Sequence, residues 1–176
     1  DRRDWAMVRQ VHGAGVVVAD HVGHLGDADA IVTATPQVPI AVRVADCAPV
    51  ALVADGAIGV VHAGWRGIVA GVLPAALDAM QSLGATDIRA VLGPCIHAEC
   101  YEFGGDELDA VAASLGDVVR GTTSWGTPAL DVPAAIRAQV PWVEDESVCT
   151  ACSSEHWSHR ARGDQERQAL VAWLEA

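Results

Sequence analysis

The sequence predicts a single mixed α/β domain over residues 1–176, built from mixed β-sheets flanked by helices in the α+β manner. Short apolar runs of strand length alternate with turns that contain Gly, Pro and Asp. A few longer segments carry apolar residues at helical spacing. Hydrophobic residues make up 51% of the 176 residues, which is enough for one sizeable core. No internal repeat or inter-domain linker is expected.

Apolar runs in the first half of the chain predict most of the strands. They are 7–13, Ala30–Thr33, Ile40–Val44, 49–54 and 57–61, followed later by 88–92. Asp55-Gly56 predicts a tight hairpin turn between 49–54 and 57–61, because such turns need a positive φ that glycine adopts at little cost. The stretch 20–29, which is rich in Gly, Asp and His, is expected to be a loop.

Helical periodicity follows the hairpin. The strongest case is 68–83, with apolar residues at 68, 69, 72, 73, 76, 77 and 80, and Pro74 predicts a kink or a restart there. The other predicted helices are 106–115, Val132–Gln139 and 165–174. The stretches 141–146 and 153–162 are expected to be irregular.

The acidic composition limits the possible partners. The formal net charge is −12, from 11 Lys+Arg and 23 Asp+Glu, which would repel a nucleic-acid backbone. Charged or polar residues interrupt every apolar run well before the roughly 20 residues that a membrane helix needs. Small-molecule partners are therefore expected, with no nucleic acid and no membrane, and the apolar composition leaves room for a homodimer.

The cysteines and the first residues predict a cytoplasmic protein. Five cysteines is an odd number, and the stretch 1–5 has none of the hydrophobic character of a secretory signal. The thiols are then expected to be reduced and available for packing, metal binding or catalysis. Because the chain does not begin with Met, part of the natural N-terminus is expected to precede it.

The open end of the predicted hairpin is the strongest candidate site. The hairpin brings Asp46-Cys47 close to His62, and a thiolate beside an imidazole can ligate a metal or form a nucleophile–base pair. Trp65-Arg66 follow between two glycines, which places a flat aromatic ring and a fixed cation on a backbone that allows close approach. These neighbours favour a functional site over a buried cysteine beside a hydrogen-bonded histidine.

Two chemistries of this site stay open at the level of the residues. Adding His12, from the end of the first strand, gives three N and S donors, the set that a catalytic zinc takes while keeping a fourth position for water. Without a metal, Cys47 and His62 would be a hydrolase pair in which Asp46 or another carboxylate orients the imidazole. Copper oxidation chemistry is weaker, since there are only 7 histidines and neither methionine is clearly placed as an axial ligand.

Two other groups are weaker candidates. Cys95, Cys100, Cys149 and Cys152 could form a structural zinc site, but the C-x4-C half is loose and Pro94 and Tyr101 favour packing. A thioredoxin-like role for the C-x-x-C pair is disfavoured because no βαβ unit surrounds it. The basic, aromatic stretch 157–162, followed by Arg167-Gln168, is either a solvated face or an anion or ribose clamp that folds back onto the Cys/His rim.

Seven motifs occur in an order that resembles the laccase-domain (polyphenol-oxidase-like, YfiH-like) family over essentially the whole chain. They lie at 10–13, 45–50, 62–67, 93–96, 100–102, 149–150 and 158–160, and the most specific are Ala-Asp-Cys-x-Pro-Val and His-Ala-Gly-Trp-Arg-Gly. The resemblance implies a mixed α/β fold, with a few further N-terminal strands missing from this chain. It also implies one zinc held by two histidines and a cysteine, which match His12, Cys47 and His62.

The same resemblance implies a zinc-dependent purine nucleoside phosphorylase for adenosine, inosine, guanosine and methylthioadenosine, with adenosine deaminase activity. The alternatives are a multicopper polyphenol oxidase (laccase), with copper in place of zinc, a metal-free Cys/His hydrolase, and a factor that edits peptidoglycan precursors. A non-enzymatic nucleoside-binding protein is the remaining alternative.

Roles follow for single residues. Arg66 and Arg160, with the amides at the start of the 68–83 helix, are expected to hold phosphate. Further roles are assigned to Asp46 as orienter of the metal site, Trp65 as a stacking ring, His159 as a proton donor, and Gln10 and Arg167 as substrate contacts. The chain departs from the family pattern at His97 and Glu166, where the family usually has Gly. His97 is expected to add a donor to the pocket or to crowd it, and Glu166 changes the tail that is expected to contact the substrate.

Overall fold

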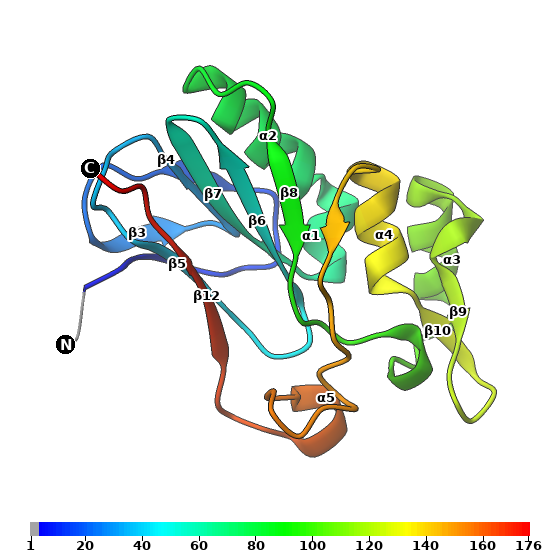
Figure 1. The fold of residues 1–176 in the computed structure, drawn as a ribbon. Helices are drawn as coiled ribbons and strands as arrows, with labels where there is room; N and C mark the ends of the chain where they lie inside the picture. Colours follow the sequence, from blue (N-terminus) through cyan, green and yellow to red (C-terminus); the bar gives the residue numbers. More distant parts are fainter. Residues whose placement is uncertain (1–3) are drawn as a thin grey trace.

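Two main β-sheets, a two-stranded sheet and several helices build the fold of the described residues (Figure 1). The computed structural model describes residues 4–176, so residues 1–3, at the start of the stretch in which no secretory signal is expected, lie outside the described residues. The larger sheet has the strand order β11-β8-β6-β7-β4-β2 and the smaller has the order β12-β5-β1-β3. The predicted mixed α/β fold with helix-flanked sheets is confirmed.

The larger sheet contains β2 (Val16–Val18), β4 (Ala30–Thr33), β6 (Ala48–Ala54), β7 (Ala57–Ala63), β8 (Arg89–Leu92) and β11 (Glu144–Asp145). The smaller contains β1 (Ala6–Arg9), β3 (Gly23–Asp27), β5 (Ile40–Val44) and β12 (Gln168–Ala172). A separate hairpin is formed by β9 (Arg120–Thr122) and β10 (Pro128–Leu130). The helices are α1 (Trp65–Ala70), α2 (Val72–Ser82), α3 (Gly105–Leu115), α4 (Val132–Gln139) and α5 (His159–Arg162), with 3-10 turns η1 (Ala98–Cys100) and η2 (Asp117–Val119).

The larger sheet lies between the smaller sheet and the helices, and it is buried on both faces. Side chains alternate along β7, so that Ile58 and Val60 pack toward the smaller sheet while Val61 and Ala63 pack toward the helices. Burial on both faces explains why this strand is a continuous apolar run.

The predicted hairpin is confirmed by the register of β6 and β7. Ala54 pairs with Ala57, which leaves Asp55-Gly56 as the turn, and Gly56 has φ +74°. The predicted β4, β5 and α4 have the observed bounds, and α3 and β8 each differ by one residue at the N-terminal end. Strong alternation or helical spacing made these elements predictable.

The predicted helix at 165–174 is wrong, because this segment contains the strand β12. It pairs antiparallel with β5, from Gln168 opposite Val44 to Ala172 opposite Ile40. Leu170 and Ala172 are two residues apart and both pack against the core of the smaller sheet. Pairing along the free edge of β5 therefore outweighs the helical propensity of this segment.

The predicted 68–83 helix begins earlier and is interrupted at a different residue. It starts at Trp65 as α1, and the break lies at Gly71, with φ +87°, rather than at Pro74. Pro74 sits in the first turn of α2, where the missing N–H costs nothing. Three stretches expected to be irregular contain short elements, β3 within 20–29, β11 within 141–146 and α5 within 153–162.

Gly71 gives a test of the helix break. No atom lies within 4 Å of a Cβ built there, so a Gly71→Ala substitution strains only the backbone. We expect Gly71→Ala to lower the free energy of unfolding by about 1–2 kcal/mol, because φ is positive. Gly105→Ala is the control: its built Cβ also meets open space, but its φ is not positive, so stability should stay level or rise slightly. Equal urea-unfolding midpoints for the two variants would contradict the strained turn.

Candidate active site

The pairing of β6 with β7 places Cys47 and His62 side by side. Pro49 lies directly opposite His62, so Cys47, one residue before β6, is a diagonal neighbour on the same face of the sheet. His62 is 3% exposed and continues the face of β7 that carries Val60. Cys47 is half-buried at the rim.

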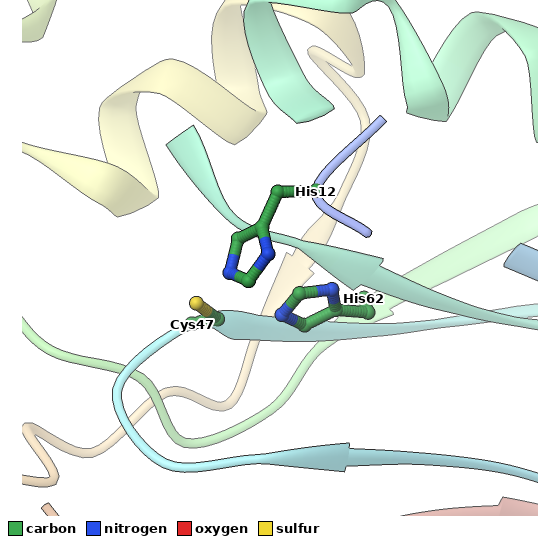
Figure 2. A group of neighbouring side chains, drawn as sticks. All are labelled: His12, Cys47 and His62. Carbon is green, nitrogen blue, oxygen red and sulfur yellow. The ribbon is translucent and has the colours of Figure 1, made fainter. Parts of the chain in front are cut away.

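His12 completes a group of three donors. It comes from the turn after β1, and its imidazole points toward the other two side chains (Figure 2). The ligand atoms of His12, Cys47 and His62 all lie within 4.8 Å of one another, and the two imidazole rings meet edge to face with centroids 4.8 Å apart. The structure therefore brings together the three residues that the sequence predicts as metal ligands, with the exposed His12 on the solvent side.

Asp29 orients two of these donors at once. Its carboxylate accepts hydrogen bonds from the backbone N–H groups of Val11, His12 and Gly13, at 3.2, 2.9 and 2.7 Å. It also lies 2.8 Å from Nδ1 of His62, which leaves Nε2 to face Cys47. Asp29 is fully buried. Burial opposes its ionisation, but the hydrogen bonds from His62 and from the backbone of Gly13 and His12 keep its pKa below the usual value.

The sequence leads us to expect that Asp46 or another carboxylate orients the imidazole, and it is another carboxylate, Asp29, that contacts the His62 ring. Ala30 pairs with Val61 across the β4–β7 ladder, so Asp29 is the residue that falls opposite His62. The clue in the sequence was a lone Asp directly before a buried strand, but the preceding stretch was interpreted as a loop with no fixed position relative to His62. Register, not proximity in sequence, decides which carboxylate reaches the ring.

The group is electrostatically prepared to bind a cation. Burial opposes ionisation of the Cys47 thiol, yet hydrogen bonds from His12 and His62 lower its pKa to about 6. Burial also disfavours a charged His62, while Asp29 and Cys47 together raise its pKa to about 9. Near neutral pH the metal-free site is thus a thiolate paired with an imidazolium, and a metal ion would take the place of the shared proton.

The backbone leaves room for this cluster at Gly64. A Cβ built on Gly64 would lie 2.8 Å from Cδ2 of His12 and 3.3 Å from Sγ of Cys47. Only glycine allows the imidazole and the thiol to pack this closely against the chain. The donor set, two imidazoles and one thiolate with one ring fixed by a carboxylate, fits zinc and also copper.

Asp46 instead anchors the C-terminal segment. Its carboxylate accepts from Oγ1 of Thr150 at 2.7 Å and from the backbone N–H of Arg160, also at 2.7 Å. Asp46 has φ +83°, a conformation that is uncommon for a residue other than glycine. The basic tail thus folds back onto the Cys/His rim, as one of the two sequence interpretations expected.

Arg160 covers an aromatic residue that the sequence analysis missed. Its guanidinium lies 5.2 Å from the ring centroid of Tyr101 and donates to the carbonyl of Glu102. Tyr101 lines a small hollow of about 30 Å³ with Cys47 and Trp65, and Arg160 and Glu102 line a larger cavity of about 690 Å³ with Trp125. Tyr101 lies within the motif at 100–102, where the sequence favours a packing role for it.

The Trp65-Arg66 pair lies at the start of α1. Trp65 meets Phe103 edge to face at 5.3 Å, and Arg66 lies 4.3 Å above the Trp65 ring with its side chain exposed. The amide of Ile68 does not face a ligand, contrary to expectation, because it lies inside α1 and donates to the carbonyl of Gly64. Burial is the main cause that raises the pKa of Tyr101 to about 12. The positive charges of Arg160 and Arg66, which border the rim, partly offset this rise.

The remaining predicted contacts lie at or beyond the edge of this site. The amide of Gln10 exchanges two hydrogen bonds with the backbone of Arg43, which ties the turn after β1 to β5. Arg167 donates to the carbonyls of Asp164 and Glu166. His159 is exposed on α5, with Nδ1 3.3 Å from the carbonyl of Asp164.

His97 turns away from the Cys/His rim. Its Nε2 lies 3.0 Å from Oγ of Ser147, and its ring lines a separate shallow hollow with Glu99 and Asp145. This departure from the family pattern therefore does not crowd the donor group.

Over the part of the chain that the structure describes, no helix is long and apolar enough to cross a membrane.

The chain is similar in sequence to several named proteins. A purine nucleoside phosphorylase of Streptomyces coelicolor is 43% identical over 96% of this chain and 74% of its own length. A protein named adenosine deaminase RL5, from an unknown prokaryotic organism, is 35% identical over 78% of this chain and 59% of its own length.

Solved structures show the same fold. YlmD from Geobacillus stearothermophilus matches with a TM-score of 0.86 and 28% identity, over 98% of this chain and 74% of that one. Neisseria meningitidis protein NMB0706 matches with a TM-score of 0.85 and 31% identity, over 97% and 75% of the two chains. The family model described as multi-copper polyphenol oxidoreductase laccase matches residues 1–175, and the chain belongs to that family.

Proposed function

We propose that this chain is a zinc-dependent purine nucleoside phosphorylase that also deaminates adenosine. The observation that carries the proposal is the convergence of two imidazoles and a low-pKa thiol beside a rim with two arginines and two aromatic rings. Relatives named purine nucleoside phosphorylase and adenosine deaminase support it. The expected substrates are adenosine, inosine, guanosine and methylthioadenosine, with phosphate as the second substrate.

His12, Cys47 and His62 would hold the zinc. When bound, the ion would lower the pKa of a water molecule in its fourth position, which is the chemistry that deamination of a purine needs. Asp29 holds His62 in the tautomer that presents Nε2, and its bonds to the backbone hold the turn that carries His12. The exposed edge of His12 leaves a side of the site open to a ligand.

The chain supplies cations and aromatic faces for the nucleoside and the phosphate. Arg160 lies over Tyr101 beside the larger cavity, where its unused donors can hold phosphate while the glycosidic bond loosens. Arg66 is exposed on α1 and is the second phosphate candidate, and Trp65 or Tyr101 would stack on the base. His159 would exchange a proton through Nε2, since Nδ1 faces the carbonyl of Asp164.

We propose zinc instead of copper because Met80 lies on the opposite face of the strand and because the chain has few histidines. A blue-copper site adds a soft axial ligand such as methionine to two imidazoles and a thiolate. The sulfur of Met80 packs against Gly59, on the helix-side face of β7, whereas His62 lies on the opposite face. Multicopper oxidation also draws on many histidines, and the chain has 7.

A metal-free hydrolase is the second candidate, and one observation favours it. Asp29, His62 and Cys47 follow one another in the carboxylate–imidazole–thiol order of a nucleophilic triad. Such a triad needs only one imidazole, so His12 would have no role in it.

Turnover tests the proposed function directly. We expect adenosine with phosphate to give adenine and ribose 1-phosphate, and adenosine without phosphate to give inosine alone, with products separated by chromatography. The His12→Ala variant should lose both activities, because it removes one donor from an exposed position without opening the core. Absence of both adenine and inosine with the zinc-loaded protein would refute the proposal.

Metal analysis tests the ligand assignment. We expect His12→Ala and Cys47→Ser each to carry about one zinc per chain less than the unsubstituted protein, as measured by elemental analysis after gel filtration. The reason is that a three-donor site loses most of its affinity when one donor is removed. Copper in place of zinc, or unchanged zinc in both variants, would rule out this assignment.

Alkylation of Cys47 separates the zinc site from the hydrolase pair. In chelator-treated protein the alkylation rate should fall as the pH falls through about 6, where the thiolate becomes protonated. Added zinc should protect Cys47 if it is a ligand. Undiminished alkylation in zinc, together with alkylation-sensitive ester or amide hydrolysis, would favour the metal-free hydrolase.

Asp29→Asn tests the carboxylate that binds the backbone of His12 and the ring of His62. One amide oxygen cannot replace two carboxylate oxygens that accept from three backbone N–H groups and His62. We expect zinc affinity to fall about 10- to 100-fold, measured by competition with a chromogenic chelator. Asp27→Asn is the matched control: it removes an exposed ion pair with Arg9, and zinc affinity should not change. Equal affinities for the two variants would show that Asp29 does not support the site.

A further inference from the structure

A second group of sulfur donors lies outside the site described above. Cys100, at the end of η1, and the pair Cys149 and Cys152 place their sulfur atoms within 4.8 Å of one another. The Sγ atoms of Cys100 and Cys152 are 3.3 Å apart. The group has a buried member, Cys149, and an exposed one, Cys152.

The spacing of these sulfurs suits a shared metal ion. Zinc binds thiolates at about 2.3 Å in a tetrahedron, so two sulfurs on one zinc lie roughly 3.8 Å apart. Two of the sulfurs lie 3.3 Å apart and all three lie within 4.8 Å of one another, which is compatible with that value. Three sulfurs from two segments about 50 residues apart in sequence are therefore close enough to share one ion.

The carboxylate of Glu99 lies near one of these sulfurs. Oε1 of Glu99 is 4.0 Å from Sγ of Cys152, and Glu99 directly precedes Cys100 in η1. Carboxylate oxygen is an accepted zinc ligand beside thiolates. Cys95, which the sequence interpretation counted as a fourth sulfur, lies outside the group and is fully buried.

We propose that Cys100, Cys149 and Cys152 supply three ligands of a second, structural zinc site. The site does not depend on the proposed nucleoside chemistry.

The ion would fasten the C-terminal segment next to the first site. Thr150 follows Cys149 directly, donates its amide to the carbonyl of Cys95 and its hydroxyl to Asp46. Asp46 is the neighbour of Cys47 and also holds the backbone of Arg160. Zinc on Cys149 and Cys152 would therefore tie η1 to the segment that positions Asp46 and Arg160.

Zinc counting tests the proposal. Protein purified under nitrogen with reductant should carry two zinc ions per chain, and the Cys100→Ser/Cys152→Ser variant should carry one. The His12→Ala variant should also carry one, and the triple variant none. If the first site does not bind zinc, the unsubstituted protein and His12→Ala should both carry one ion, and the Cys100→Ser/Cys152→Ser variant none, so failure of the proposed function is distinguishable.

Cobalt and a matched cysteine sharpen the test. In the His12→Ala background, added Co²⁺ should give intense thiolate-to-cobalt absorption that Cys152→Ser strongly reduces. Cys95→Ala, which removes a thiol outside the group, should keep both the absorption and the zinc count. One zinc in the unsubstituted protein that the Cys100→Ser/Cys152→Ser variant retains would overturn the proposal.

Two further results would overturn it without any variant. One is a Cys100–Cys152 disulfide in the reduced preparation, detected by thiol titration and mass spectrometry. The other is a thermal unfolding midpoint that does not change when chelator removes the second ion.

Discussion

The buried carboxylate of Asp29 is the interaction on which the arrangement of the site depends. It is fully buried, and it accepts from the backbone of Val11, His12 and Gly13 as well as lying against His62. An unpaired carboxylate at this position would cost several kcal/mol, so the turn after β1 and the ring of His62 must both keep their places. One side chain thus sets the direction of two donors from segments 50 residues apart.

Asp46 fixes the C-terminal segment beside the donor group by hydrogen bonds, as Asp29 fixes the turn after β1. It joins Thr150 and the backbone of Arg160 to the residue next to Cys47. His12 and Asp46 are two of the four non-glycine residues with positive φ in the described part of the chain. The strain at these positions is balanced by the hydrogen bonds that the two aspartates collect, and both positions border the donor group.

The sequence predicts the parts of this site that depend on residues near one another in the chain, and not the parts that depend on pairing between distant strands. The β6–β7 hairpin and its Asp-Gly turn are local, so the proximity of Cys47 and His62 was predictable. Asp29 was missed because its position opposite His62 depends on the non-local β4–β7 register, and because β3, which precedes it, is a strand only through its parallel pairing with β1. For the same reason the helix predicted at 165–174 is the strand β12, whose conformation is decided by β5.

The position of His12 favours the proposed metal site over a nucleophilic triad. Asp29, His62 and Cys47 would be sufficient for proton transfer to and from a thiol. The fold nevertheless holds a second imidazole against the same sulfur, at a non-glycine residue with φ +59°, and leaves no side chain at Gly64 so that ring and thiol fit. In a triad, His12 would transfer no proton, and nothing would offset the strain of its backbone. As a third ligand of a metal ion, its binding energy would offset that strain. The cost of placing His12 is therefore the physical argument for a metal.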